Sequence, residues 1–346
     1  MTVIDLHANA YVNDILAQPK ALRDTLAGLT TDQLNAIAQR WTSGRYRRIV
    51  LTGMGSSFHA LHPIHLELLA HGLWPQRLET SELIHFTPEI LTDDTLVVVV
   101  SQSGRSVEIL RLLERNQGRS TVVAITNSAD NPLADQADVA LVTRAGAESA
   151  VSCKTYVVSL MALSLLSAAL TGQDVDTRVK LWSTVPDLVA AYLSHWEDHV
   201  EAARAALTDI RALYYTGRGP SQATAGTAGL TTKESTHFPA EGMSVAAFRH
   251  GPFELIDPDV AVFVLEGAGP TTALNLALAA DVTAAGGRAL LVGRSGTGWM
   301  SLPDSPALAL PVLEILPVQM VTLALATARG HAPGVFQLGT KVTAVE

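Results

Sequence analysis

The chain is poor in cysteine, in charged residues and in aromatic residues for its length. One cysteine among 346 residues, Cys153, excludes an intramolecular disulfide framework and a zinc module built on cysteines. Charged residues make up 16% of the chain and aromatic residues 5%, whereas 48% of it is hydrophobic. This composition excludes a disordered protein and predicts sizeable cores, divided between about two domains of roughly 150 residues each.

Neither a secretion signal nor a membrane-spanning run is visible. The first 22 residues lack a basic start followed by an apolar run. The longest apolar stretch, at 157–170, is interrupted by serines and is shorter than the roughly 20 residues that cross a bilayer, so we expect a buried helix there. Together with the lone cysteine, these absences predict a cytoplasmic protein with no membrane partner.

The charge balance disfavours a nucleic-acid partner. Lysine and arginine number 24 and aspartate and glutamate 33, which gives a net charge of −9. General nucleic-acid binders are usually basic, so we expect no nucleic acid here. A small anionic ligand is not excluded, because it responds to the charges of its own site.

The two halves of the chain repeat one pattern, in which a short apolar strand runs into a Gly/Ser turn and then a helix. Continuous apolar runs such as 95–100 are typical of strands buried on both faces of a parallel sheet. The pattern predicts two doubly wound α/β domains. The expected strand-and-turn segments are 47–57, 95–104, 120–127 and 139–146 in the first half, and 209–221, 260–267, 288–296 and 307–313 in the second.

These segments predict a linear order of domains. We expect a helical N-terminal segment at 1–42, a first α/β domain at 43–175, a helical linker at 176–205, a second α/β domain at 206–330 and a C-terminal tail at 331–346. The tail ends in the β-prone sequence KVTAVE.

Two turns of the first domain are rich in hydroxyl groups. In open α/β sheets ligands bind outside the carboxyl ends of the strands, and a helix that begins there favours an anion. The turns therefore predict a phosphate site, although serines at these positions commonly serve only as helix caps. The residues concerned are Gly55, Ser56, Ser57, Ser101, Gln102, Ser103 and Ser106.

The sequence lacks the motifs of several other kinds of ligand site. The turn GMGSSF has Phe58 where a dinucleotide fingerprint needs its third glycine, and no P-loop ending is present. His59, His62 and His65 are spaced three apart, but Pro63 interrupts the run and no zinc motif accompanies it. We therefore expect neither a cofactor nor a metal.

The segment 230–257 holds the densest group of acid–base residues. Glu234 there could be an ordinary surface charge, and His250, which precedes Gly-Pro, could be an ordinary turn residue. Taken with Lys341 near the C-terminus, however, they are the groups that a sugar isomerase needs. A carboxylate moves a proton between adjacent carbons, a histidine opens a sugar ring and a lysine forms an imine.

The sequence resembles the sugar isomerase (SIS) domain family, and within it the isomerase half of glucosamine-6-phosphate synthase and its deaminase relatives. The resemblance covers nearly the whole chain and implies two tandem SIS domains of flavodoxin-like fold. The stretches that carry it are GMGSSFH, SQSGRS, AGAESAVSCKTY, YTGRGPS, KESTHFPAEGMSVAAFRHGP and KVTAVE.

The resemblance also implies roles for individual residues. Glu234 is the implied base between C1 and C2, and Lys341 lies near the sugar carbonyl, where the synthase forms an imine. His250 is implied in ring opening, contributed by the neighbouring subunit of a homodimer. The implied phosphate ligands are Ser56, Ser57, Ser101, Gln102, Ser103 and Ser106.

The chain departs from the synthase in three respects. We expect no glutaminase domain before the SIS pair, and hence no ammonia from glutamine. Arg105 stands where the synthase has an acid. The loop that carries Glu148 and Lys154 is one residue shorter, and we expect Gly55, Arg105, Glu148 and Lys154 to be further contacts of the substrate.

These departures favour the reaction that releases ammonia. The leading hypothesis is an isomerase that deaminates a phosphorylated amino sugar, most simply glucosamine 6-phosphate to fructose 6-phosphate and ammonia. The alternatives are a fructosamine 6-phosphate deglycase, a phosphosugar isomerase that does not deaminate, and a sugar-phosphate sensor without catalysis.

Overall fold

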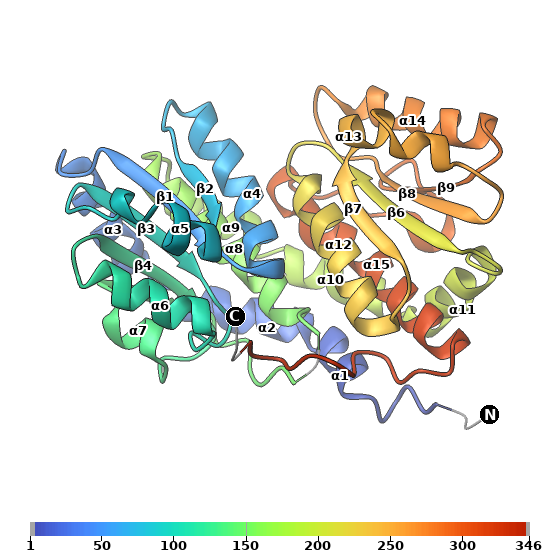
Figure 1. Cartoon of the computed structure of the whole chain (residues 1–346), viewed down its shortest axis with the longest axis horizontal. Helices are drawn as coiled ribbons and strands as arrows, with labels where there is room; N and C mark the ends of the chain where they lie inside the picture. The colour runs from blue at the N-terminus through green and yellow to red at the C-terminus, as the bar shows by residue number, and fades with distance from the viewer. Residues whose placement is uncertain (1–3, 150, 344–346) are drawn as a thin grey trace. The chain divides into compact units, whose positions relative to one another are not determined.

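The computed structural model describes residues 4–149 and 151–343 and contains two parallel sheets flanked by helices (Figure 1), which confirms the predicted fold class. The described chain divides into two compact units. Unit A comprises the described residues of Lys20–Glu148, Lys154–Pro186 and Leu338–Glu346. Unit B comprises those of Met1–Pro19, Ser149–Cys153 and Asp187–Gln337.

Unit A is built on a five-stranded parallel sheet in the order β2-β1-β3-β4-β5. Strands β3 and β4 are buried at every residue, as their runs TLVVVV and TVVAIT predict. The chain passes from β1 to β2 on one side and later to β3 on the other, so the switch point lies between β1 and β3. The strands are β1 (Arg48–Gly53), β2 (Gln76–Glu79), β3 (Thr95–Val100), β4 (Thr121–Thr126) and β5 (Val139–Val142); the connecting helices are α4 (Gly55–Ala70), α5 (Thr80–Phe86), α6 (Val107–Asn116) and α7 (Pro132–Gln136).

Unit B repeats this design with a four-stranded parallel sheet in the order β7-β6-β8-β9, and its switch point lies between β6 and β8. The strands are β6 (Ala212–Gly217), β7 (Ala240–Ser244), β8 (Val260–Leu265) and β9 (Arg288–Val292); the helices are α12 (Ser221–Thr236), α13 (Val245–Arg249), α14 (Thr272–Ala284) and α15 (Leu310–Ala328).

One strand prediction was wrong. The segment 307–313 is a short 3-10 turn followed by the start of α15. Its apolar run ALALPVL suits a buried helix as well as a buried strand. Pro311 lies in the first turn of α15, where a missing N–H costs nothing. Helix α15 is apolar and long enough to cross a membrane, but 89% of that stretch is buried in the structure, as in the core helix of a soluble protein.

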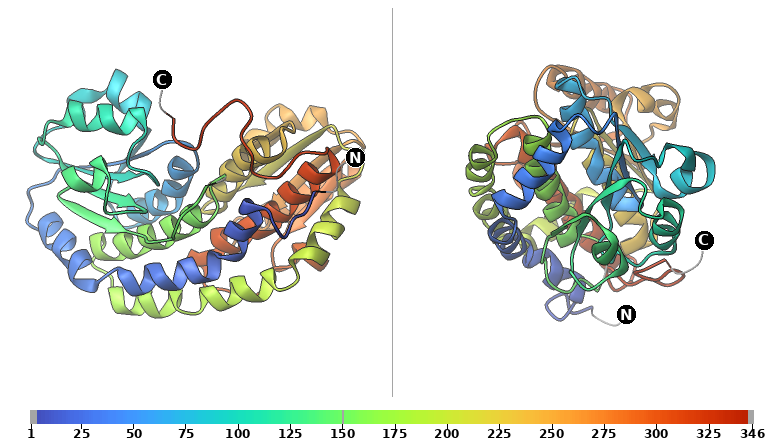
Figure 2. Two further views of the ribbon diagram at one scale, coloured as in Figure 1. Left: turned by 90° about the horizontal axis from the view of Figure 1, so that it is seen from below. Right: turned by 90° about the vertical axis from the view of Figure 1, so that its left-hand side faces the viewer.

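Both units are interrupted in sequence because helices from distant parts of the chain complete them. In unit B, α1 lies beside α15 (Figure 2), and the Tyr11 and Thr322 hydroxyls are 3.4 Å apart. The amides of Gln18 and Gln319 bond each other at 2.8 and 3.0 Å. The expected segments 1–42 and 176–205 are accordingly shared between the units. The remaining helices are α1 (Ala10–Leu16), α2 (Gln18–Gly28), α3 (Thr31–Thr42), α8 (Lys154–Leu170), α9 (Val175–Trp182), α10 (Val185–Leu193) and α11 (Trp196–Ala206).

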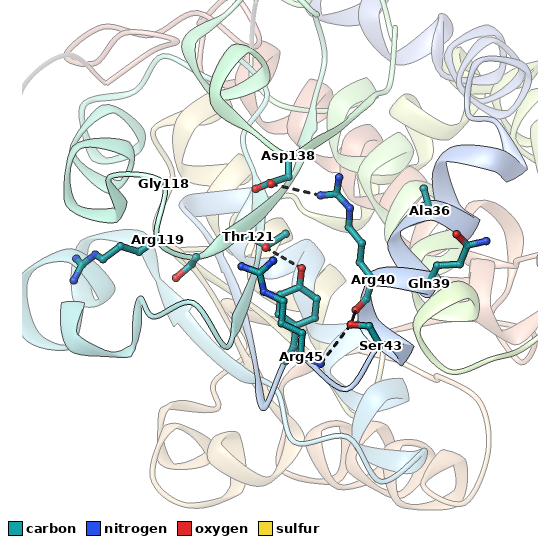
Figure 3. Close-up of a pocket in the computed structure, with 11 residues that line it drawn as sticks. Ala36, Gln39, Arg40, Ser43, Arg45, Gly118, Arg119, Thr121 and Asp138 are labelled. Atoms are coloured by element: carbon teal, nitrogen blue, oxygen red, sulfur yellow. Dashed lines mark hydrogen bonds and ion pairs between the residues drawn. The ribbon is translucent and has the colours of Figure 1, made fainter.

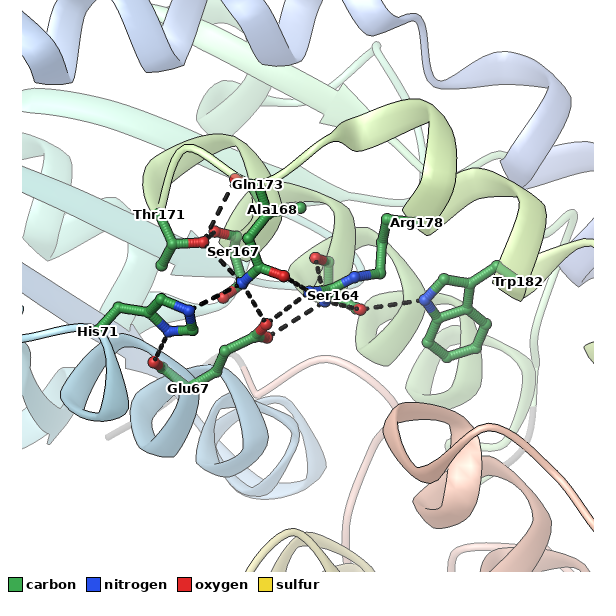
Figure 4. A network of polar contacts seen from close by, with 9 residues as sticks. All are labelled: Glu67, His71, Ser164, Ser167, Ala168, Thr171, Gln173, Arg178 and Trp182. Atoms are coloured by element: carbon green, nitrogen blue, oxygen red, sulfur yellow. Dashed lines mark hydrogen bonds and ion pairs between the residues drawn. The ribbon is translucent and has the colours of Figure 1, made fainter.

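A buried polar network holds α4 in place within unit A. Arg178 donates to Glu67 at 2.6 Å and to the Ser164 hydroxyl at 2.9 Å, and Trp182 donates to the same hydroxyl (Figure 4). Burial acts to raise the pKa of Glu67, but the charge and hydrogen bonds of Arg178, together with hydrogen bonds from Ser167 and Gln173, outweigh it and hold that pKa below its ordinary value. The network joins α4 to α8 and α9, and so fixes the helix whose first turn carries Ser56 and Ser57.

Candidate functional site

The first hydroxyl-rich turn begins where β1 ends. A Cβ at Gly53 would lie 2.9 Å from the Val100 carbonyl oxygen, so glycine lets β1 end close to β3. Helix α4 starts two residues later, and Ser56 and Ser57 lie half-buried in its first turn. The turn therefore presents two hydroxyls at a helix N-terminus, where an anion is favoured.

The second hydroxyl-rich turn follows β3. The Ser101 hydroxyl accepts the Gly104 N–H at 3.1 Å, and the Ser103 hydroxyl accepts the Arg105 N–H at 3.2 Å. Gly104 has φ +61°, and a Cβ there would overlap the Asn131 side chain at 1.9 Å, so only glycine suits this position. These bonds fix the turn in one conformation.

Helix capping does not explain the serines. The N-cap of α4 is Met54, which makes no side-chain cap bond. The N-cap of α6 is Ser106, whose side chain makes no cap bond either. The residues predicted to bind phosphate thus lie in two turns that lead into helices, on either side of the switch point.

The Arg105 side chain contacts Asp130, in the loop that follows β4. Its guanidinium donates to the Asp130 carbonyl oxygen at 2.6 Å and lies 3.7 Å from the Asp130 carboxylate. The side chain is half-exposed, whereas that carboxylate is fully exposed. Arg105 therefore links the second turn to the loop after β4.

Glu148 and Lys341 form an ion pair in unit A. The Lys341 ammonium donates to Glu148 Oε2 at 2.8 Å, and the Glu148 side chain is fully buried. Thr155 donates to the same carboxylate through its N–H at 3.0 Å and its hydroxyl at 2.6 Å. Burial acts to raise the pKa of Glu148, but the Lys341 charge and the Thr155 bonds outweigh it and keep that pKa below its ordinary value.

The C-terminal tail also bonds to α6. The Val107 N–H donates to the Thr343 carbonyl oxygen at 3.1 Å, directly after Ser106. Lys341 is two residues earlier, so the structure brings the tail lysine and the second hydroxyl turn onto the same part of unit A. Residues 341–343 form no strand, and the rest of the β-prone end lies outside the described residues. Lys154 is buried and donates to the Ala147 carbonyl oxygen at 2.6 Å.

Glu234 lies in the last turns of α12, in unit B. A Cβ at Gly229 would lie 2.4 Å from the Gly242 nitrogen, and one at Gly242 would lie 1.9 Å from the Ala225 carbonyl oxygen. These glycines let α12 lie directly against β7, and the Lys233–Glu241 ion pair at 3.2 Å joins the two elements again. Glu234 is half-buried on this helix.

His250 is exposed at the end of α13, also in unit B. Its N–H donates to the Ala247 carbonyl oxygen, and Gly251 follows with φ +148°, so the chain turns sharply after the histidine. The predicted residues are thus divided: the phosphate turns, Glu148, Lys154 and Lys341 belong to unit A, and Glu234 and His250 to unit B.

Two residues that the sequence did not single out contact a predicted site residue or its chain neighbour. Thr155 anchors Glu148, but a threonine at a helix start carries no signal beyond capping. Arg77 on β2 lies 4.6 Å from the centre of the Phe58 ring, which follows Ser57. Burial lowers the pKa of Arg77, although the nearby Glu79 carboxylate acts to raise it. An arginine in a short strand is indistinguishable by sequence from a surface charge.

A cavity of about 620 Å³ lies at the other end of the unit A sheet. Its lining includes Thr121, the first residue of β4, and three arginines, Arg40, Arg45 and Arg119 (Figure 3). Arg40 there faces Asp138 at 3.4 Å. Ligands of parallel sheets bind at the carboxyl ends, so this cavity is not assigned to the site. Within residues 4–149 and 151–343, no group of three His, Cys, Asp or Glu side chains is placed to hold a metal.

Comparison with known proteins finds relatives that align with more than nine-tenths of the chain. The family model of the SIS domain matches residues 45–169. Glutamine–fructose-6-phosphate aminotransferase (isomerizing) from Pyrococcus horikoshii is 30% identical over 93% of this chain and 55% of its own length. The Corynebacterium diphtheriae protein of the same name is 28% identical over 92% and 55%. The chain spans about half the length of these curated relatives.

Solved structures share the fold of both units. The C-terminal domain of glucosamine-fructose-6-phosphate aminotransferase from Francisella tularensis has a TM-score of 0.84 at 21% identity, covering 95% of this chain and 98% of that one. Glucosamine-6-phosphate deaminase from Thermotoga maritima has a TM-score of 0.79 at 18% identity, covering 97% and 100%. The fold of both units agrees with these similarities, and residues 45–169 belong to the SIS domain family.

Proposed function

We propose that this chain is a phosphosugar isomerase that deaminates an amino-sugar phosphate, with glucosamine 6-phosphate converted to fructose 6-phosphate and ammonia. The observation that carries the proposal is the Lys341 ammonium, 2.8 Å from the buried Glu148, on a tail that bonds α6 beside the serine turn. A carbonyl-reactive amine and an anion site on one unit suit a sugar that carries a phosphate and a carbonyl group. The names of the similar proteins, an aminotransferase of fructose 6-phosphate and a glucosamine-6-phosphate deaminase, support the same substrate class.

In this mechanism the phosphate binds at the Ser56–Ser57 and Ser101–Ser106 turns, and the site acts on the other end of the sugar. His250, from the neighbouring subunit of a homodimer, takes the proton of the C1 hydroxyl and returns a proton to the ring oxygen. The C1–O5 bond breaks and the open-chain aldehyde forms. This is general acid–base catalysis, a role that an imidazole can perform.

Glu234 then carries out the isomerisation. Its carboxylate takes the proton from C2 while the protonated amino group gives a proton to O1, which leaves an enolamine. The carboxylic acid then returns its proton to C1, which leaves a protonated ketimine at C2. Water adds to C2 and ammonia departs, which gives fructose 6-phosphate. No electron acceptor is needed, because C1 is reduced as C2 is oxidised.

Lys341 stabilises the carbonyl carbon at C2 or bonds to it transiently. If it bonds, its amine displaces ammonia from the ketimine and water later hydrolyses the new imine. Glu148 positions this amine, because a carboxylate with a lowered pKa stays ionised and attracts the ammonium form. The amine acts as a nucleophile only in its unprotonated form.

The test is ammonia release coupled to detection of fructose 6-phosphate. The panel contains the 6-phosphates of glucosamine, galactosamine and N-acetylglucosamine and a fructosamine 6-phosphate. Ammonia and ketose from one amino sugar, lost in Glu234→Gln, are expected. Glu241→Gln is the matched control, because Glu241 is an exposed carboxylate on β7 and should keep its activity.

The products separate the alternatives. A deglycase would release the amino acid from the fructosamine phosphate, and a simple isomerase would interconvert aldose and ketose without ammonia. Binding without turnover of any substrate, unchanged in Glu234→Gln, would contradict the proposed enzyme and favour a sensor.

A further inference from the structure

The two sheets end in the same kind of turn at their switch points. Strand β1 ends in Thr52-Gly53-Met54-Gly55 and β6 in Thr216-Gly217-Arg218-Gly219, each before a helix. A Cβ at Gly217 would lie 2.9 Å from the carbonyl carbon of Ser221, and a Cβ at Gly53 would lie 3.2 Å from the carbonyl carbon of Ser57, so each glycine lets the end of its strand pack closely against the first turn of the following helix. Unit B therefore has the backbone framework of a second anion site.

The side chains in that framework differ from those in unit A. Strand β3 is followed by Ser101, whereas β8 is followed by Glu266. Glu266 accepts the Ser295 N–H at 2.7 Å and the Ser295 hydroxyl at 2.8 Å. Gly293, at φ +155°, leaves the room for it, since a Cβ there would lie 2.3 Å from a Glu266 carboxylate oxygen.

A second carboxylate takes the hydroxyls at the start of α12. Glu314 of α15 is fully buried and accepts Ser221 Oγ at 2.7 Å and Thr224 Oγ1 at 3.1 Å. Burial raises the pKa of Glu314 to about 7, although these hydrogen bonds act to lower it. The Glu266 carboxylate adds to the rise. The hydroxyls that could meet a phosphate are thus already bonded to a carboxylate of the same unit.

We propose that Glu266 and Glu314 close the switch point of unit B to phosphate, so that the chain carries a single phosphate site, in unit A. The inference rests on the proposed function for the site in unit A. A phosphate group carries about 1.5 to 2 negative charges near neutral pH, and burying it beside one or two carboxylates is strongly unfavourable. The pair therefore determines which of two similar turns receives the substrate.

The test counts binding sites with glucitol 6-phosphate, an open-chain sugar phosphate that has no carbonyl group and is not turned over. Titration calorimetry of the wild type should give one site per chain. The variant Glu266→Ser/Glu314→Gln removes both carboxylates and places a hydroxyl after β8, as Ser101 does after β3. It should therefore bind a second molecule of glucitol 6-phosphate per chain. The control Glu241→Gln/Glu254→Gln changes two exposed glutamates of the same unit and should keep one site.

A folded Glu266→Ser/Glu314→Gln variant that still binds one ligand would overturn the inference. If that variant does not fold, Glu314→Gln alone decides, because it keeps the shape of the side chain. At about pH 8.5, where a carboxyl group of pKa about 7 is ionised, Glu314→Gln in a Ser101→Ala/Ser103→Ala background should bind inorganic phosphate at least about tenfold more tightly than that background alone, as seen in ³¹P line broadening. Unchanged binding would again overturn the inference. If Ser101→Ala/Ser103→Ala binds phosphate as the wild type does, the proposed phosphate site in unit A is wrong. The comparison of binding with and without Glu314→Gln still tests the inference about unit B.

Discussion

The charge of Glu148 is the residue-scale feature that most directly affects the proposed chemistry. Glu148→Gln keeps the shape of the buried side chain but removes the attraction that holds the Lys341 ammonium at 2.8 Å. Hydrogen bonds to charged groups contribute about 2 kcal/mol, so kcat for ammonia release should fall by roughly thirtyfold. KM should change little, because the serine turns are unaltered.

The control for this prediction is Glu89→Gln, an exposed glutamate of the same unit, which should leave kcat unchanged. A loss confined to KM would assign Glu148 to substrate binding instead. Lys341→Met should lower kcat at least as far as Glu148→Gln does, since it removes the group that Glu148 holds.

Glu314 predicts how the stability of unit B depends on pH. Its pKa is raised from 4.5 to about 7, mainly by burial, so the folded protein keeps a proton that the unfolded chain releases. Stability from this group is complete below pH 4.5 and is lost as the pH rises to 7, by about 3 kcal/mol. Glu314→Gln stays neutral, so its stability relative to the wild type should rise over that interval and then level off.

Urea unfolding of both proteins between pH 4.5 and 8 measures this difference. Glu254→Gln, at an exposed position of unit B, should show no such trend. A stability difference between Glu314→Gln and the wild type that is constant with pH would mean that the folded protein does not hold the Glu314 proton.

At the scale of elements, the contact between α12 and β7 fixes the position of Glu234. In Gly229→Ala the new Cβ would lie 2.4 Å from the Gly242 nitrogen, which is backbone and cannot move aside. We expect a loss of about 2 kcal/mol or more in stability, together with a fall in kcat, because α12 must shift away from the strand. Thermal unfolding and ammonia release measure the two effects.

Gly28→Ala is the matched control, because its Cβ would meet only the Arg144 side chain at 3.5 Å. Alanine favours a helix over glycine, so this variant should be as stable as the wild type or slightly more stable. Equal effects of the two substitutions would show that helix propensity, rather than the close approach to β7, governs position 229.

The elements also show what the sequence could predict. Strands β3 and β4 were predictable because their apolar runs are buried on both faces. Strands β2 and β7 were not, because QRLE and AEGMS lie at the sheet edges and carry polar residues. The run at 307–313 was assigned as a strand because a short apolar segment suits either structure.

The serine turns were predictable because they follow strands directly in sequence. The partners of Glu314 and Lys341 were not, since Ser221 is 93 residues from the first and Glu148 is 193 residues from the second. Pairings over such separations follow from the packing of whole elements, which local patterns do not encode.

At the scale of the whole molecule, the proposed homodimer predicts complementation between inactive subunits. Glu234→Gln and His250→Ala should each abolish ammonia release on their own. If His250 acts on the neighbouring subunit, a mixed dimer has one site with both wild-type groups and one site with neither. Random reassortment of equal amounts should therefore restore about a quarter of wild-type activity.

The exposure of His250 at the end of α13 suits a group that acts on another subunit, whereas Glu234 is half-buried on α12. Co-expression of the two variants with different tags, followed by purification through both tags, isolates the mixed dimer and should give about half the activity per dimer. A mixed dimer without activity would require both residues from one chain, because every site would then contain one defect. The same measurement thus decides whether the active unit is one chain or two.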